Sequence, residues 1–113
     1  MQKLIKYMKV GNQTATTISL CLLKDYDLTS RAIQKAIEKM GGLEILVNLL
    51  ETNDLKCQYG SLSVLLQIVT SSEMRRILIN LGIVTSLIQL LKRPVRDIQV
   101  SSYYYFLCGY LDY

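Results

Sequence analysis

Residue types that carry most enzyme chemistry are scarce in this chain of 113 residues. It contains no histidine, which removes the usual general base at neutral pH and the group that activates a serine or cysteine nucleophile. Cys21, Cys57 and Cys108 are widely spaced and form no CxxC pair, which predicts reduced thiols and neither a disulfide framework nor a zinc site. Gly41-Gly42 is not part of a glycine-rich phosphate-binding motif such as GxGxxG or GxxxxGK. The sequence therefore predicts a protein that is not an enzyme and needs no metal or cofactor.

A strip of small and polar residues is a better candidate for function. Lys56, Gly60, Ser63 and Gln67 recur at i, i+4, i+7 and i+11, which places them along one side of a helix. Gly60 and Ser63 would leave room for the backbone of a partner, and the Gln67 amide could hydrogen-bond to it. The corresponding positions 41 residues later, a second rung of the same groove, are Asp97, Ser101 and Tyr104. The alternative, which the sequence leaves open, is that the strip is only the solvated side of a helix.

Aromatic residues gather near the C-terminus, in SSYYYFLCGYLDY. The candidates for an exposed packing face are Tyr103, Tyr105, Phe106 and Tyr110. Tyrosine is enriched at the centres of protein interfaces, so this face could anchor a partner. It could equally be half of an interface with a further repeat. If left uncovered, it would be an apolar patch that permits self-association through the C-terminal repeat.

The elements that would position these residues occur more than once. MGGLEILVNLL at 40–50 is followed 41 residues later by LGIVTSLIQLL at 81–91. A short amphipathic helix is predicted before each segment by apolar residues that recur at i, i+3, i+4 and i+7 and end on the first residue of the segment. They are Ile33, Ala36, Ile37 and Met40, then Met74, Ile77, Leu78 and Leu81. Gly41 and Gly82 would supply the left-handed residue that separates this helix from the next.

Each of these first helices has a candidate N-cap, Ser30 in one copy and Ser72 in the other. The second helices that follow have matching apolar stripes: Leu43, Leu46, Val47 and Leu50, then Val84, Leu87, Ile88 and Leu91. A third helix then begins, with Asn53 or Asp54 as its cap in the first copy and Pro94 near its first turn in the second.

The third helix is apolar around most of its circumference. Its predicted core residues are Cys57, Ser61, Val64, Leu65 and Ile68, and Leu62, Leu66 and Val69 widen the apolar surface. Such a helix must be packed between neighbours, with one strip facing water. About 40 residues arranged as three helices is the repeat unit of an α-solenoid. We therefore expect an incomplete repeat at 1–28, a full repeat at 29–70, and a repeat with an atypical tyrosine-rich last helix at 71–113.

The glycine turn followed by LVNLL, the pair Ile98-Gln99 and the 41-residue period resemble armadillo repeats. KLIKYMKVGNQTATTISLC, MGGLEILVNLLET and LKCQYGSL are most similar, in register from Gln2 to Leu91, to the axonemal members of that family, which dock outer dynein arms. The resemblance implies an all-α, armadillo-type α-solenoid, a right-handed superhelix of three-helix repeats. It also implies a non-catalytic scaffold on the axoneme of motile cilia, whose partners are dynein-arm docking or coiled-coil proteins.

Two features depart from the family pattern. Those family members have many more repeats, so the chain would correspond to a fragment, a short isoform or a truncated gene product. After Arg93 the pattern drifts, and Tyr105 stands where armadillo repeats usually place alanine. Overpacking of that kind costs roughly 1–3 kcal/mol, so the last helix could dock differently.

A second function stays open, that of a soluble adaptor that grips extended peptides as importin-type armadillo proteins do. That mode uses a ladder of tryptophan and asparagine, whereas this chain has no tryptophan and places Gln67 and then Cys108 at the asparagine position. It also favours an acidic groove, whereas Lys56 lies in this one.

The distribution of charge argues against nucleic acid as a partner. The net charge is +4, but the 13 lysines and arginines are spread along the chain, and the densest group is Lys92, Arg93 and Arg96. MQKLIKYMK does not read as a signal peptide, and no apolar run approaches the roughly 18 residues of a membrane span. We therefore expect a cytoplasmic protein with no membrane or nucleic-acid partner.

Overall fold

The computed structural model describes residues 2–9 and 12–92, and within these ranges the chain forms helices and turns but no strand. The helices are α1 (Gln2–Lys9), α2 (Gln13–Leu23), α3 (Arg31–Lys39), α4 (Gly42–Leu49), α5 (Leu55–Ile68), α6 (Ser72–Asn80) and α7 (Ile83–Leu91). The all-α class expected from the sequence is confirmed.

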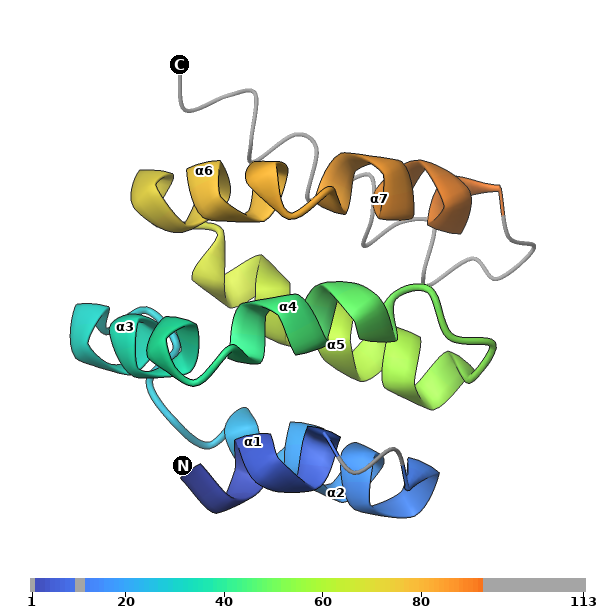
Figure 1. The fold of residues 1–113 in the computed structure, drawn as a ribbon, viewed down its shortest axis with the longest axis horizontal. Coiled ribbons are helices and arrows are strands. Elements are labelled where there is room, and N and C mark those ends of the chain that lie inside the picture. Colours follow the sequence, from blue (N-terminus) through green and yellow to red (C-terminus); the bar gives the residue numbers. More distant parts are fainter. Residues whose placement is uncertain (1, 10–11, 93–113) are drawn as a thin grey trace.

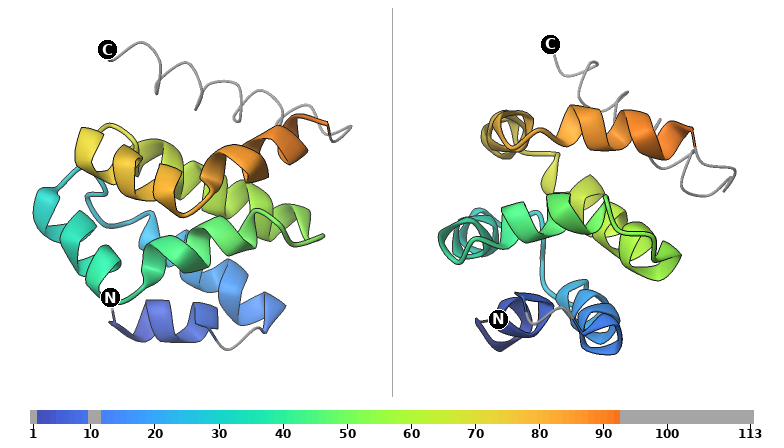
Figure 2. Two further views of the ribbon diagram at one scale, coloured as in Figure 1. Left: turned by 45° about the horizontal axis from the view of Figure 1, so that its top comes forward. Right: turned by 45° about the vertical axis from the view of Figure 1, so that its right-hand side comes forward.

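The helices stack in layers that follow the order of the chain (Figure 1). α1 and α2 form one layer, α3, α4 and α5 the next, and α6 and α7 lie beyond them. Two further views preserve this order (Figure 2). The first two layers contact each other mainly through α2 and α5, and to a smaller extent through α1 and α4. Each layer therefore buries its apolar surface against the next, as in a solenoid.

Two glycines make the sharp turns between short helices. Gly41 and Gly82 have φ angles of 73° and 86°, the left-handed conformation that glycine adopts without steric cost, as the sequence predicted. Gly42 serves a different purpose, since a Cβ atom there would lie 2.7 Å from Cγ2 of Ile37. A side chain at residue 42 would therefore force α3 and α4 apart.

The helix starts agree with the sequence except at α6. Asp54 caps α5 by accepting a hydrogen bond from the Lys56 backbone N–H at 3.1 Å. The N-cap of α6 is Ser71, whose hydroxyl accepts from the Met74 backbone N–H at 3.4 Å, whereas Ser72 is the first helical residue. The prediction of Ser72 was wrong by one position because two consecutive serines were available and spacing alone does not choose between them.

Side-chain-to-backbone hydrogen bonds at equivalent positions begin two successive layers. The Gln34 side-chain amide donates to the Leu28 carbonyl at 2.9 Å. Forty-one residues later, the Arg75 guanidinium donates to the Val69 carbonyl at 2.6 Å. Each bond satisfies a carbonyl just before the first helix of a layer, where the main-chain ladder offers no donor. The repeat thus extends from the apolar pattern to the polar contacts that join one layer to the next.

The predicted core of α5 is confirmed. Cys57, Ser61, Val64, Leu65 and Ile68 are all buried, and so are Leu62 and Val69. The prediction for α7 was partly wrong, because Val84 and Ile88 are exposed while Ile83 and Leu90 are buried with Leu87. Ile83 occupies the position that Gly42 holds in the earlier copy, and its side chain is fully buried, so the Ile83 side of α7 faces the core.

Candidate functional site

The candidate groove strip follows the exposed side of α5, in the middle layer. Lys56 and Gln67 are exposed and Ser63 is half-buried, so these three side chains reach the surface along one side of the helix. The Ser63 hydroxyl donates to the Tyr59 carbonyl at 2.8 Å within the same helix. Its oxygen can still accept a hydrogen bond from a partner. Part of the predicted strip is therefore a continuous surface.

Gly60 does not lie on that surface. It is buried, and a Cβ atom added there would lie 3.1 Å from Cδ1 of Leu20 on α2. The small residue lets two helices from successive layers approach each other, so it leaves no room for the backbone of a partner. The expectation that Gly60 is open to a partner is corrected: in a helix packed on two sides, the spacing of small residues does not show which side the neighbour occupies.

Tyr59 takes the place in the strip that Gly60 was expected to hold. Its side chain is 45 % exposed, three residues after Lys56 and four before Ser63. The Lys24 ammonium, from the end of α2, lies 5.9 Å from the centroid of the Tyr59 ring, at the edge of the range for a cation–π contact. Sequence reasoning missed Tyr59, although its i+3 and i−4 relation to two strip residues was the signal that could have revealed it.

The amino-terminal ends of α2 and α5 form a small polar cleft beside the strip. It has a volume of about 190 Å³ and is lined by Gln13, Thr14, Thr17, Ile18, Asp54 and Lys56. The Cys57 thiol donates to Oδ2 of Asp54 at 3.0 Å, and its sulfur lies 3.8 Å from the Thr17 hydroxyl. The cleft is therefore anchored by contacts between the two helices.

These contacts shift two pKa values in opposite directions. The hydrogen bond from the Cys57 thiol, followed by one from the Gln13 side chain, lowers the pKa of Asp54. Burial, and then the hydrogen bond to Asp54, raises the pKa of Cys57. A raised pKa leaves the thiol protonated at neutral pH, and a protonated thiol is a poor nucleophile. Cys57 therefore fits the role of a small core residue, as expected.

The remaining candidates lie outside the residues that the structure describes. These are Asp97, Ser101 and Tyr104 of the second rung, and Tyr103, Tyr105, Phe106 and Tyr110 of the C-terminal packing face. Within residues 2–9 and 12–92, no group of three or more histidine, cysteine or acidic side chains is placed to hold a metal ion. No single helix of these ranges is both long and apolar enough to cross a membrane; α6 and α7 pass that test only as a pair, bent by 84°.

Known proteins resemble this chain both in sequence and in fold, although no family model matches it. It is 53% identical over 76 residues, or 67% of the chain, to "Outer dynein arm-docking complex subunit 2" of Bos taurus. It is 52% identical over 79 residues, or 70% of the chain, to "Armadillo repeat-containing protein gudu" of Drosophila melanogaster. The matched residues are 7% and 12% of those two proteins, so the chain spans only a small part of either relative.

Solved structures give the same answer for the fold. A designed armadillo repeat protein superposes with a TM-score of 0.84 at 16% identity, over 95% of this chain and 45% of that one. A second, solved in complex with the peptide (KR)4, gives a TM-score of 0.87 at 14% identity, over 96% of this chain and 46% of that one. The chain belongs to the armadillo-repeat family. As in other armadillo repeat proteins, its fold is an α-solenoid.

α2 and α5 are the last helices of the first two layers (Figure 1), where the sequence predicted the third helices of armadillo repeats. The exposed strip of α5 therefore lies on the helix that the sequence predicted to line the groove. The similarity to the two relatives extends over fewer residues than the span from Gln2 to Leu91 that the motifs indicated. The use of the groove by a partner stays a prediction.

Proposed function

We propose that this armadillo repeat protein is a non-catalytic protein–protein interaction scaffold that helps to dock outer dynein arms on the axoneme of motile cilia. The supporting observation is the identity of 53% with a protein named as an outer dynein arm-docking complex subunit. An identity of 50% with the mouse protein of the same name supports it as well. The cilium axoneme is accordingly the proposed location, reached from the cytoplasm.

The groove strip of α5, comprising Lys56, Tyr59, Ser63 and Gln67, is the proposed partner site. Tyr59 offers a large half-exposed ring at low conformational cost, which is why tyrosine is frequent among interface anchors. Gln67 offers both a donor and an acceptor to a partner backbone. The strip carries Lys56 and no carboxylate, and Lys24 lies over the Tyr59 ring. These charges favour a neutral or acidic segment of a partner, such as one helix of a coiled coil.

The rest of the groove is proposed on sequence alone. Asp97, Ser101 and Tyr104 would continue the strip, and the C-terminal aromatic residues would pack on a further repeat or on a second copy. The repeat boundaries proposed with them are 1–28, 29–70 and 71–113. Direct partners would therefore contact two neighbouring repeats, which is a short groove for this fold.

An adaptor for basic peptides is the alternative function. A structural neighbour was solved with the peptide (KR)4, which shows that an armadillo fold can hold such a ligand. In the present chain, Lys24 and Lys56 stand along the corresponding helices and would repel lysine and arginine side chains. We therefore expect a (KR)4 peptide to bind weakly or not at all.

Rescue of ciliary structure tests the proposal directly. Ciliated cells that lack the protein should lose outer dynein arms in electron micrographs of axoneme cross-sections, and the wild-type protein should restore them. The double variant Tyr59→Ala/Gln67→Ala should reach the axoneme at reduced levels and restore few arms, because it removes the anchor and the hydrogen-bonding amide. Tyr7→Ala is the matched control, since that ring is similarly exposed but lies on α1, away from the strip.

Three outcomes would contradict the proposal in whole or in part. Localisation of the tagged protein away from cilia would reject the docking role itself. Tight binding of a (KR)4 peptide that Tyr59→Ala/Gln67→Ala abolishes would instead favour the adaptor. Normal rescue by the groove variant would leave the docking role in place but reject this site.

A further inference from the structure

Three lysines of α1 and one from the end of α3 meet in one open cleft between these two helices. The larger part of the cleft, about 620 Å³, is lined by Gln2, Lys3, Ala36, Lys39 and Met40. An adjoining part of about 350 Å³ is lined by Gln2, Ile5, Lys6, Lys9, Lys39 and Met40. Gln2, Lys39 and Met40 line both parts, so they form one continuous surface. The described residues that line it include no acidic side chain.

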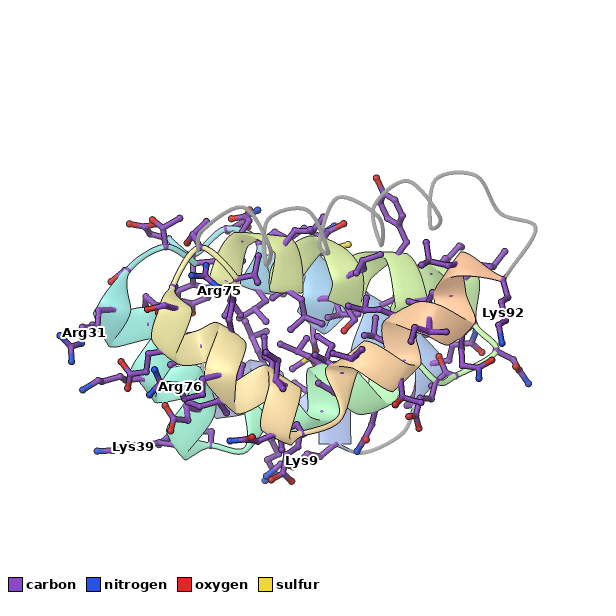
Figure 3. The ribbon with its side chains drawn as sticks, turned by 90° about the horizontal axis from the view of Figure 1, so that it is seen from above. Lys9, Arg31, Lys39, Arg75, Arg76 and Lys92 are labelled. Atoms are coloured by element: carbon purple, nitrogen blue, oxygen red, sulfur yellow. The ribbon has the colours of Figure 1, made fainter. Side chains whose placement is uncertain are left out.

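The fold brings these lysines together at the meeting of two layers. Lys3, Lys6 and Lys9 are spaced by three residues along α1, and all are exposed. Lys39 comes from the end of α3, in the next layer. The Lys9 ammonium also reaches the turn between α3 and α4, 3.9 Å from where a Cβ of Gly41 would lie. In Figure 3, Lys9 and Lys39 point outward along the same edge of the molecule, and Arg31 continues that edge.

Helix electrostatics explain only part of this arrangement. A lysine in the last turn of a helix is stabilised by the negative end of the helix dipole, which accounts for Lys9 and Lys39 individually. Lys3 lies near the opposite, positive end of α1, where the dipole opposes it. On α3, Arg31, Lys35 and Lys39 are spaced i, i+4 and i+8, and like charges at that spacing destabilise a helix. Because the four lysines line the cleft and its described lining includes no acidic side chain, a bound anionic group would relieve their mutual repulsion.

We propose that this cleft binds an acidic peptide segment of a partner protein. The distance along α1 from Lys3 to Lys9 is about 9 Å at 1.5 Å per residue. In an extended peptide, side chains on one face recur about every 7 Å, so two glutamates at i and i+2 reach both ends of this row. The floor of the cleft is apolar, formed by Ile5, Ala36 and Met40, and suits the methylene groups of glutamate.

The lining favours a peptide over nucleic acid. Within the described ranges the cleft offers lysine but no arginine fork for phosphate and no aromatic ring on which a base could stack. The site is separate from the α5 strip, and the inference does not depend on the proposed docking role.

Fluorescence anisotropy with a labelled polyglutamate peptide tests the proposal. A peptide of about eight residues spans roughly 27 Å when extended and so exceeds the row of lysines. We expect saturable binding to the complete chain that is lost near 1 M salt, where the Debye length falls to about 3 Å. Lys39→Glu should raise the Kd about fivefold or more, because it replaces an attraction with a repulsion. The milder Lys39→Gln should raise it about twofold, and circular dichroism should show both variants folded.

Lys92→Glu is the matched control. It makes the same change in net charge, also at an exposed helix C-terminus, but lies at the far end of the molecule (Figure 3). Its Kd should stay within about twofold of wild type. Equal weakening by Lys92→Glu and Lys39→Glu would overturn the proposal, because only net charge would then matter. So would the absence of peptide binding, or tighter binding of short duplex DNA or phosphatidylserine vesicles with the same dependence on Lys39.

Discussion

α2 and α5 are the last helices of successive layers (Figure 1), but they differ in whether a neighbouring layer covers the same side of the helix. Ile18 and Leu22 lie six and ten residues after the N-cap residue of α2, and Gly60 and Val64 lie six and ten residues after that of α5. In α5 both positions are buried. In α2 the two larger side chains are 54 % and 46 % exposed.

This difference shows that the neighbouring layer, more than the residue type, decides what is buried in this fold. A glycine is enclosed while an isoleucine at the corresponding position faces solvent. The reason is geometric: the side of α5 that holds Gly60 rests on α2, and the same side of α2 rests on no element of the described residues. Stability should therefore be concentrated in α5 and its contact with α2.

The largest expected effect comes from emptying the core of α5. Leu65 is fully buried, so Leu65→Ala should lower the free energy of unfolding by roughly 2–5 kcal/mol, through lost burial and a residual cavity. Leu22→Ala makes the same chemical change on the open side of α2 and should cost only about 0.5 kcal/mol. Urea denaturation followed by circular dichroism measures both. An equal loss for the two variants would show that the open side of α2 is covered in solution.

A smaller effect should follow from filling the contact between the two helices. Gly60→Val places branched carbons against Leu20, where even a Cβ atom would lie 3.1 Å away, and such overpacking costs roughly 1–3 kcal/mol. Ile18→Val puts the same residue at the corresponding position of α2 and should change stability by no more than about 0.5 kcal/mol.

A double-mutant cycle sharpens this test. If the introduced valine clashes with Leu20, Leu20→Ala should lower the free energy of unfolding less in the Gly60→Val background than in the wild type. The reason is that the truncated side chain leaves room for the valine. Additive effects of the two substitutions would mean that the strain of Gly60→Val lies elsewhere.

Much of the fold was predictable because its signals are local. Left-handed glycines at 41 and 82, the cap at Asp54 and the buried stripe of α5 each depend on a few consecutive residues, and each was confirmed. The rotation of α7 was not predicted, because the buried Ile83 replaces a glycine and the choice between Ile83 and Val84 as the inward residue depends on what the helix packs against.

The surfaces were harder to predict because they depend on contacts between layers. The burial of Gly60 and the exposure of Tyr59 follow from where α2 lies, which a single helical pattern does not contain. The basic residues illustrate the same point. In the sequence Lys39 stands 30 residues after Lys9, yet stacking α1 beside α3 brings Lys39 to the row of lysines on α1.

The smallest expected effect concerns the caps that begin the two helices. Asn12 caps α2 by accepting from the Ala15 backbone N–H at 3.1 Å, and its amide does not titrate. Asp54 caps α5, and its pKa is lowered chiefly by the hydrogen bond from Cys57. A carboxylate with a lowered pKa in the folded state stabilises the fold at pH values above its ordinary pKa of 3.8, and this contribution is lost as the pH falls through the lowered value.

Replacing the charged cap with a neutral one isolates this contribution. Asp54→Asn keeps a good N-cap residue but makes the start of α5 resemble that of α2. The melting temperature of the variant should lie slightly below that of wild type above about pH 5, and the two curves should converge as the pH falls below about 4. Because every other carboxylate titrates in both proteins, the difference between the curves reports on Asp54. A difference that stays constant down to acidic pH would show that the charge of Asp54 does not stabilise α5, and that its cap acts through hydrogen bonding alone, as the cap of α2 does.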